Sequence, residues 1–357
     1  MDSPRRTVIR LGVAGLVALS AIVWHGGGAS AAKTVKVAFL MPCSTCADRF
    51  ETKDKPYFIQ SVKSLDPNIS VIANNAEGSD STQLAQAESA LTNGAKVIVT
   101  SPLDGPTGAA IIAKASAQHV PVIAYDGMIT GAKPDFYVSF SNVKVGQLQG
   151  QYLAKHVRAG GIIAFINGAQ TSDPGRQFKA GAHSALDPLF QSGKFKLGYE
   201  KDTDWLPATG QAAMEEALTK LSDKVDGVMA ANDGLAGGVI TALTARHLNG
   251  KVLVTGQDAT DAGLQRIIVG DQSMTVYKPL RKEAYAAAEL AVDLATGKRS
   301  AANKLAKASV NNGTAKVRSI LLKPISVTKS NIRSTVIKDK FTTWKNICPS
   351  HSSSSCA

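Results

Sequence analysis

The sequence predicts an α/β protein made of two doubly wound, Rossmann-like lobes, each with a parallel sheet covered by helices on both faces. Ten apolar, β-branched segments alternate with helix-length segments between residues 35 and 297. Ten strands are too many for one ordinary sheet, so two lobes of about five strands each are expected. Several strands also end in polar residues, which places a candidate site at the sheet edges.

The strands are predicted from runs of apolar and β-branched residues bounded by polar or turn residues. In chain order they are VKVAFL, SVIANN, KVIVT, VPVIAY, FYVSF, GIIAFIN, FKLGYE, DGVMA, KVLVTG and MTVY. Between most of them apolar residues recur at helical spacing, as at Leu84, Ala87 and Leu91. Buried strands separated by such helices indicate βαβ crossovers and parallel sheets.

Three strands between residues 226 and 279 run directly into polar side chains. DGVMA leads to Asn232, KVLVTG to Gln257 and Asp258, and SMTVY to Lys278. Ligands of open parallel sheets bind outside the carboxyl ends of the strands. Amide, carboxylate and ammonium groups there suit a polyhydroxylated small molecule. No nucleophile or metal motif follows these strands, so the pattern favours a binding site over a reaction centre, with no cofactor expected.

Residues 1–31 have the organisation of a signal peptide. Arg5, Arg6 and Arg10 precede and flank the apolar run LGVAGLVALSAIVW, and residues 29–31 fit an A-x-A cleavage site. The apolar run is short for a membrane span, and the sequence has no second long apolar stretch. We therefore expect an exported protein, located in the periplasm or at the outer face of the cell envelope.

The net charge of +12 is concentrated at the two ends of the chain. Residues 1–31 carry +2, and residues 298–357, with twelve Lys and Arg against one Asp, carry +11, which leaves −1 for residues 32–297. A nearly neutral core gives no reason to expect nucleic-acid binding. The basic end could touch an anionic envelope or membrane surface, although a solvated extension is the simpler interpretation. A monomer is expected.

Four cysteines form two close pairs, Cys43 with Cys46 and Cys348 with Cys356. In an exported chain these pairs predict disulfides, with local pairing favoured among three connectivities. Two alternatives remain at this point. The C-x-x-C after the first strand could be a redox motif, or Cys43 and Cys46 could bind zinc together with Cys348 and His351.

Six motifs, in order and with their spacing, resemble those of the periplasmic D-xylose-binding proteins and related sugar-binding subunits of ABC importers. They are IAYDGMI, FYVSFSNVKVGQLQ, WLP, AANDGLAGGVITAL, GQDATDAGLQRI and MTVYKP. The resemblance spans roughly residues 35–297 and implies a type I periplasmic-binding fold, in which three crossovers join two lobes around a clamped sugar. It places the crossovers near 139–142, 257–259 and 277–279. The implied first lobe is 33–139 plus 259–277, the second is 141–257 plus 279–330, and 331–357 form a basic, disulfide-bearing extension.

The resemblance also implies a set of ligand-binding residues, most of which have a plain structural alternative. Asp126 and Asp258 would accept bonds from sugar hydroxyls, although Asp126 could be a cap or turn residue. Asn232 could simply cap a helix, Lys278 could be solvated, and Trp205, the expected stacking platform, could be a core residue. The full set is Arg49, Phe50, Asp126, Asn142, Arg176, Trp205, Asn232, Asp258 and Lys278.

Some residues depart from the pattern of the D-xylose-binding proteins. Gly127 stands in place of an arginine, Ser141 in place of an aspartate, and residues 173–176 in place of an Asn-Asn-Ala-Lys stretch. Without the guanidinium of that arginine and the carboxylate of that aspartate, the ligand site should be larger and should offer fewer fixed hydrogen bonds. The preferred sugar need therefore not be xylose.

The expected function is the capture of a monosaccharide by an extracytoplasmic protein that delivers it to an ABC permease and its ATPase. A protein that reports sugar to a membrane receptor or sensor kinase is the alternative, because both roles use the same closure of the lobes. A transcriptional regulator shares the fold but needs a DNA-binding helix-turn-helix where this chain has a signal peptide. An enzyme has no support from the catalytic motifs sought.

Overall fold

The computed structural model describes residues 34–348, apart from Asp48, together with Met1. The predicted signal peptide therefore lies outside the described residues. All ten predicted strands are present within one or two residues of the expected positions, in two separate sheets. The strands are β1 Val35–Met41, β2 Ile69–Asn75, β3 Ala95–Thr100, β4 Val122–Tyr125, β5 Phe136–Phe140, β6 Ile162–Asn167, β7 Lys196–Asp202, β8 Gly227–Ala230, β9 Leu253–Gln257, β10 Met274–Tyr277, β11 Ala308–Asn311, β12 Lys316–Leu322 and β13 Ile325–Val327.

The helices follow the strands in the expected alternation. They are η1 Phe50–Asp54, α1 Lys55–Leu65, α2 Asp80–Thr92, α3 Gly105–Ser116, α4 Asn142–His156, α5 Asp173–Gln191, α6 Pro207–Leu221, α7 Asp233–Ala245, α8 Asp261–Val269, α9 Leu280–Ala295, α10 Arg299–Leu305, η2 Lys329–Asn331, η3 Arg333–Ile337 and α11 Trp344–Ile347. Several begin with side-chain caps, such as Ser79 on α2 and Asp104 on α3. None of the helices in the described residues is long and apolar enough to cross a membrane.

The first lobe is built on the sheet β11-β12-β5-β4-β3-β1-β2 and the second on β13-β10-β9-β8-β6-β7. Pairing is parallel except at one edge of each sheet, where β11 runs antiparallel to β12 and β13 to β10. Strands β4, β5, β8 and β10 are buried along their whole length. Such burial is expected for parallel strands covered by helices on both faces.

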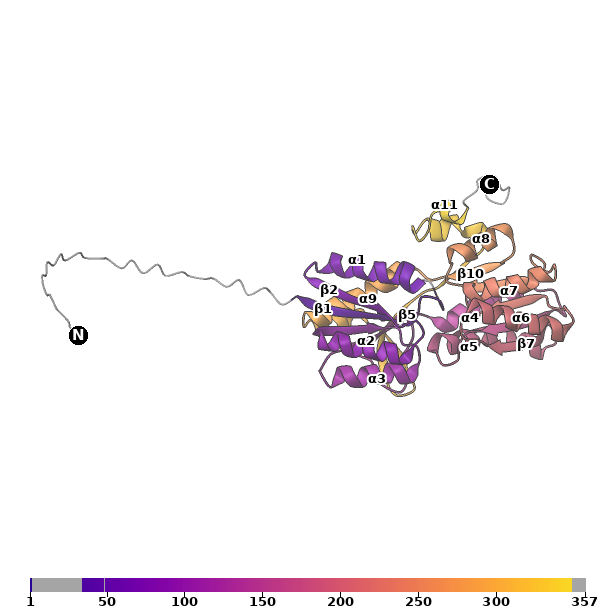
Figure 1. Cartoon of the computed structure of the whole chain (residues 1–357). Helices are drawn as coiled ribbons and strands as arrows, with labels where there is room; N and C mark the ends of the chain where they lie inside the picture. Colours follow the sequence, from indigo (N-terminus) through magenta and orange to yellow (C-terminus); the bar gives the residue numbers. More distant parts are fainter. Residues whose placement is uncertain (2–33, 48, 349–357) are drawn as a thin grey trace. The chain divides into compact units, whose positions relative to one another are not determined.

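The assignment of the last third of the chain to lobes differs from the prediction. Residues 259–277 were expected in the first lobe, but β10 pairs with β9 in the second sheet after the α8 crossover. Residues 279–330 were expected in the second lobe, but α9 packs on α1 and β3, and β12 pairs with β5. Figure 1 shows α9, in orange, among the indigo elements of the first lobe. Strand and helix patterns are local, whereas the sheet that a strand joins is fixed by residues distant in the sequence.

The chain crosses between the lobes at Ser141, at Lys278–Pro279 and at Lys323–Pro324. The predicted crossover at 257–259 is therefore wrong, because β9 and β10 belong to one sheet. The described part of the predicted extension is also not a solvated tail. Ile332, Val336 and Phe341 are buried in a cluster with Phe140 and Tyr277, next to two of the crossings.

Candidate functional site

A cavity of about 600 Å³, counted with its opening to solvent, lies between the carboxyl ends of the two sheets. The first lobe contributes residues that follow β1, β3 and β4, and the second contributes residues that follow β8, β9 and β10. Seven predicted ligand residues line it, namely Arg49, Phe50, Asp126, Trp205, Asn232, Asp258 and Lys278.

Arg49 is the centre of a buried ionic network in the first lobe. Its Nε and Nη2 each donate to Asp54 at 2.8 Å, its Nη1 donates to Asp126 Oδ1 at 2.8 Å, and its Nη2 donates to Glu283 Oε2 at 2.9 Å. The Tyr125 hydroxyl donates to the same Asp54 carboxylate. Burial alone would lower the pKa of Arg49, but the charges of Asp126, Asp54 and Glu283 raise it well above its ordinary value. Burial also raises the pKa of Glu283. Arg49 is therefore a permanent, fixed cation at the cavity wall.

Asp126 is held in an uncommon backbone conformation at the end of β4. Its φ is 57°, and the Gly127 amide donates to the Tyr125 carbonyl across it, which makes a γ-turn. The Asp126 carbonyl accepts from Tyr137 Oη at 3.1 Å and from Ser139 Oγ at 2.7 Å. These bonds fix the turn and aim the carboxylate at the cavity. Strain of this kind concentrates at functional sites.

The Asp126 carboxylate carries two charged hydrogen bonds, both on Oδ1. Arg49 Nη1 lies at 2.8 Å and Lys278 Nζ at 3.2 Å. Burial by itself would raise the pKa of Asp126, but these two cations lower it to about 2. The carboxylate therefore stays ionised at any physiological pH and leaves Oδ2 to accept from a ligand.

Asp258, on the second lobe, faces the same two cations but is not hydrogen-bonded to them. Its Oδ1 lies 3.6 Å from Lys278 Nζ and 3.9 Å from Arg49 Nη1. Among the described residues neither this oxygen nor Gln257 Oε1 has a hydrogen-bond partner, although both atoms are buried. Buried polar atoms are almost always satisfied. A ligand that donates hydrogen bonds would satisfy them.

Lys278 is the last residue of the second lobe before the chain crosses at Pro279. Its side chain is 2% exposed, so the alternative of a solvated lysine is wrong. The ammonium also lies 5.8 Å from the ring centre of Phe178 and 6.0 Å from that of Phe140. It is therefore fixed between aromatic faces and the two aspartates.

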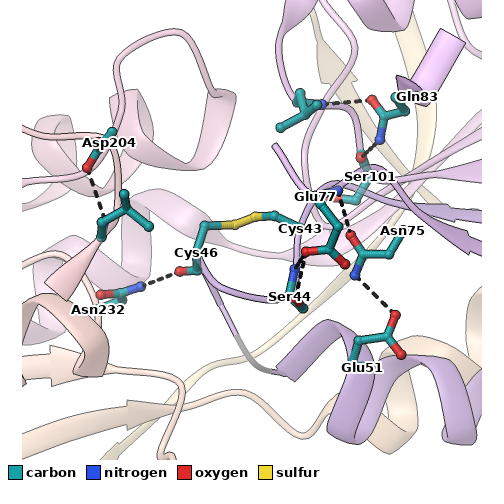
Figure 2. The surroundings of a disulfide bond; sticks show 12 residues. Cys43, Ser44, Cys46, Glu51, Asn75, Glu77, Gln83, Ser101, Asp204 and Asn232 are labelled. Atoms are coloured by element: carbon teal, nitrogen blue, oxygen red, sulfur yellow. Dashed lines mark hydrogen bonds between the residues drawn. A yellow bond between two sulfur atoms is a disulfide. The ribbon is translucent and has the colours of Figure 1, made fainter. Parts of the chain in front are cut away.

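Asn232 has two roles at the start of α7. Its Oδ1 accepts from the Leu235 amide at 2.8 Å, which is the helix cap considered as the alternative. Its Nδ2 donates at 3.4 Å to the carbonyl of Cys46 on the other lobe. Figure 2 shows this bond reaching from Asn232 to the disulfide loop. The Asn232 side chain therefore caps α7 and also lines the cavity.

Asp233 is buried behind Asn232 and ties the strand-end segments of the second lobe together. It accepts from the Thr260 amide at 2.9 Å, from Gln272 Nε2 at 2.7 Å and from Thr275 Oγ1 at 2.9 Å. Burial, with a smaller contribution from the charge of Asp258, raises the pKa of Asp233 to about 6 despite the opposing effect of Arg266. The arrangement positions the loops that carry Asn232 and Asp258.

Trp205 forms a half-buried aromatic wall on the second lobe. Its φ is 76°, and its indole packs so closely on Gly168 that a Cβ there would collide with the ring. Phe178 meets it edge-on, with ring centres 6.2 Å apart. Part of the ring contacts the core of the second lobe, and part lines the cavity. The ring is therefore held in place as a platform.

Two predicted ligand residues do not line the cavity. Asn142 is buried behind it, where its Nδ2 donates to Tyr137 Oη at 3.4 Å. Arg176 points to the loop before α5, with Nη1 donating to the Gln170 and Thr171 carbonyls. Of the departures, Gly127 lines the cavity next to Pro102 and Pro174, whereas Ser141 does not.

Of the other lining residues, Gln257 was noted as a strand-end residue, and Gly127 and Pro174 as departures from the family pattern. The lining residues that the sequence argument missed are Pro42, Cys46, Ala47, Ser101, Pro102, Leu103, Ser172 and Phe178. The strand-end rule would have found Pro42 and Ser101 if it had been applied to the first and third strands as well. Ser172 and Phe178 come from a loop and a helix, where no comparable rule exists.

The predicted Cys43–Cys46 disulfide is confirmed, with Cα atoms 5.8 Å apart. The zinc alternative is wrong, because the sulfurs of Cys43 and Cys46 are joined to each other. Within the described part of the chain no cluster of His, Cys, Asp and Glu could hold a metal. Cys348 is buried, and its pairing with Cys356 stays a prediction because Cys356 is not described.

Comparisons with known proteins agree with this geometry. The periplasmic binding protein domain family matches residues 37–299. The D-xylose-binding periplasmic protein of Escherichia coli is 41% identical over 81% of this chain and 86% of its own, and that of Haemophilus influenzae is 40% identical over 83% and 87%.

A solved structure supports the same assignment. The carbohydrate transporter solute-binding protein of Chloroflexus aurantiacus, in complex with D-glucose, superimposes with a TM-score of 0.79 at 28% identity, over 88% of this chain and 98% of its own. The two lobes, the cavity at their strand ends and these matches lead to one assignment: the chain belongs to the periplasmic binding protein family, as a solute-binding protein rather than an enzyme.

Proposed function

We propose that this protein captures a monosaccharide in the cavity between its lobes, outside the cytoplasm, and delivers it to an ABC-type permease. The observation that carries the proposal is the pair of unsatisfied buried acceptors, Asp258 Oδ1 and Gln257 Oε1, beside two fixed cations. Sugar hydroxyls supply the donors that these oxygens lack and the acceptors that the cations need. Trp205 supplies an apolar face for the sugar ring.

Capture works by closure of the two lobes. The first lobe contributes Arg49 and Asp126 to the cavity, and the second contributes Asn232 and Asp258. A sugar contacts both sets only when the lobes are closed, so it shifts the population toward the closed form by its differential affinity. The closed form is the one that the permease and its ATPase recognise.

The sugar is a xylose-like pentose or a related monosaccharide. The D-xylose-binding relatives support a pentose, whereas the glucose complex of the Chloroflexus protein shows that a close fold also holds a hexose. Gly127 supports a ligand other than xylose, because it lines the cavity where the D-xylose-binding pattern has an arginine. A Cβ at Gly127 would lie 3.5 Å from Pro102, which is ordinary contact, so Gly127→Ala tests the fit without disturbing the wall.

The test is a thermal-shift screen of pentoses, hexoses and polyols on the mature protein, followed by calorimetry on the sugars that stabilise it. We expect at least one sugar to stabilise the parent, and Asp258→Ala to lose that response. Arg158→Ala, which removes a solvent-exposed ion pair with Asp226, is the matched control and should bind as the parent does. No stabilisation by any sugar, or an equal response of Asp258→Ala, would contradict the proposal.

Two further expectations concern partners. If the protein delivers sugar to a permease, the sugar-loaded protein should stimulate the ATPase of that permease in proteoliposomes more than the empty protein does. Contact of the basic end with an anionic envelope predicts co-sedimentation with vesicles of anionic but not neutral lipid. Light scattering on a sizing column tests the expected monomer.

A further inference from the structure

The loop between β1 and η1 forms part of the cavity wall and is closed by the Cys43–Cys46 disulfide. Pro42, Cys46 and Ala47 all line the cavity, and Arg49 follows shortly after them. Cys43 is buried, whereas Cys46 is only partly covered. The cross-link therefore fixes backbone that faces the ligand.

The loop is anchored to the first lobe through Ser44. The Ser44 amide and hydroxyl both donate to Glu77 Oε2, at 3.1 and 2.6 Å. The Glu77 amide donates in turn to Asn75 Oδ1 at 3.2 Å, and the Gly78 amide donates to the Pro42 carbonyl at 2.9 Å. Figure 2 shows the bonds from Ser44 to Glu77 and from Glu77 to Asn75 on one side of the disulfide.

On its other side the same loop contacts the second lobe. The Cys46 carbonyl accepts from Asn232 Nδ2 at 3.4 Å, while Asn232 Oδ1 is held by the Leu235 amide. The donor is thus fixed by the helix cap and the acceptor by the disulfide. At 3.4 Å the bond is long, so its strength depends on how well the Cys46 carbonyl is held in place.

We propose that the Cys43–Cys46 disulfide positions this contact between the lobes and thereby sets the affinity for the ligand, so that reduction of the disulfide weakens sugar retention. This rests on the proposed function of the same cavity. The oxidised loop presents the Cys46 carbonyl to Asn232 and keeps the lining residues Pro42 and Ala47 in place. The reduced loop keeps its anchor at Ser44 but leaves the Cys46 end free to move away from Asn232.

The chemical step is thiol–disulfide exchange with a dithiol reductant. A thiolate of the reductant attacks Cys46 Sγ, because Cys46 is the less buried of the two residues, and the Sγ–Sγ bond breaks with Cys43 leaving as a thiolate that takes up a proton. The second thiolate of the reductant then attacks the mixed disulfide and releases Cys46 as a thiol. Two electrons pass to the protein, and the reductant becomes its own disulfide.

Reduction is expected to change binding much more than folding. The cross-link closes a loop with a sequence separation of only three, so it removes little chain entropy from the unfolded state. The core strands of the first lobe do not depend on it. Loss of one weak neutral hydrogen bond, together with a less ordered wall, corresponds to a roughly three- to tenfold loss of affinity.

The experiment compares Cys43→Ser/Cys46→Ser with Cys348→Ser/Cys356→Ser, each purified without reductant. Calorimetry uses the sugar that stabilises the parent protein most in the screen above. We expect the first double variant to bind three- to tenfold more weakly with a dissociation rate raised to match, and the second to bind within twofold of the parent. A circular dichroism spectrum like that of the parent checks that each variant is folded.

A second arm uses the redox chemistry itself and leaves Cys43 and Cys46 unsubstituted. In the Cys348→Ser/Cys356→Ser background, Cys43 and Cys46 are the only cysteines, so dithiothreitol acts on them alone. Its addition should weaken binding by the same factor, and removal of the reductant with reoxidation should restore it. The extent of reduction is read from thiol alkylation by mass spectrometry.

The outcomes separate the two proposals. If the parent binds a sugar and both the reduced protein and Cys43→Ser/Cys46→Ser bind it equally well, the role of the disulfide is overturned and the proposed function stands. If the parent binds no sugar, the proposed function fails, and the role of the disulfide fails with it. Weaker binding in both arms, with the control pair unaffected, supports the proposal.

Discussion

Asp126 of the first lobe and Asp258 of the second both line the cavity and present the same group with different hydrogen bonding. Both have positive φ, 57° and 98°, and both are within 4 Å of the two cations Arg49 and Lys278. Asp126 already accepts hydrogen bonds from both cations, whereas Asp258 Oδ1 accepts none among the described residues. The first lobe thus provides a carboxylate, Asp126, that is already bonded to both cations, and the second provides the open acceptor Asp258 Oδ1. The ligand proposed for this cavity would therefore bind mainly by donating to the second lobe.

The largest effect is expected from removal of Arg49, the cation that Asp54, Asp126 and Glu283 of the first lobe share. Arg49→Met leaves Asp54, Asp126 and Glu283 buried without their common partner, so we expect the free energy of unfolding to fall by about 3–5 kcal/mol. Urea denaturation measures the loss. Arg158→Met is the control, because that arginine makes an equally short but exposed pair and should cost less than about 1 kcal/mol. Equal losses would mean that the Arg49 network contributes no more than a surface pair.

The pH dependence of stability distinguishes the two lobes further. The pKa of Asp233, behind the open side, is raised from 3.8 to about 6, so the folded state binds this proton more tightly than the unfolded state. Relative to Asp233→Asn, the parent should gain up to about 3 kcal/mol of stability as the pH falls from 7 to 4. Urea denaturation at several pH values gives the slope.

Asp126 should change the free energy of unfolding with pH in the opposite direction. Its pKa is lowered to about 2, so its contribution is present above pH 3.8 and is lost as the pH falls from 3.8 to 2. Relative to Asp126→Asn, the parent should therefore lose about 2 kcal/mol over that interval. Two results would contradict these predictions. One is a parent protein that gains stability relative to Asp126→Asn between pH 3.8 and pH 2. The other is an Asp233→Asn variant whose unfolding free energy changes with pH as steeply as that of the parent.

Binding affinity tests the comparison directly. Asp258→Asn should weaken sugar binding by about 1.5–3 kcal/mol, which is roughly ten- to a hundredfold, because the bonds to its open oxygen form only with ligand. Asp126→Asn should lower both affinity and unfolding free energy, since its bonds to Arg49 and Lys278 exist without ligand. Calorimetry and urea denaturation on the two variants provide the matched pair. If Asp258→Asn destabilises the empty protein as much as Asp126→Asn does, the asymmetry is absent.

The smallest effect is expected outside the cavity. Arg176 donates to the carbonyls of its own loop and does not line the site, so Arg176→Ala should change sugar affinity by less than about twofold. Trp205→Ala, which removes the aromatic wall, is the comparison and should cost about tenfold or more. A loss at Arg176 as large as that at Trp205 would show that the loop before α5 is part of the site.

The strands and the strand-end residues of the second lobe could be predicted because they follow from local patterns. Asn232, Asp258 and Lys278 each come directly after an apolar strand, and parallel strands bring their carboxyl ends together. The same pattern could not assign β10 to a lobe, since an apolar four-residue strand fits either sheet. Its assignment depends on pairing with β9 and with β13, fifty residues later in the chain.

The ionic network of the first lobe could not be predicted from the sequence for a similar reason. Glu283 lies 234 residues from Arg49 and reaches it only because α9 returns to the first lobe. The positive φ values of Asp126, Trp205 and Asp258 are equally invisible in the sequence, because they are imposed by surrounding bonds rather than by residue type. Asn142 shows the converse, that a matching motif position does not fix where a side chain points.

The return of the chain to the first lobe has a consequence for biogenesis. Strand β5 is covered on its outer edge only by β12, which begins at Lys316. During synthesis from the amino end, the β5 edge therefore stays unpaired until nearly the whole chain has emerged. An exposed, apolar strand edge is a template for association between chains. The β5 edge is therefore protected from association with other chains only once residues 316–322 have been synthesised and paired with it.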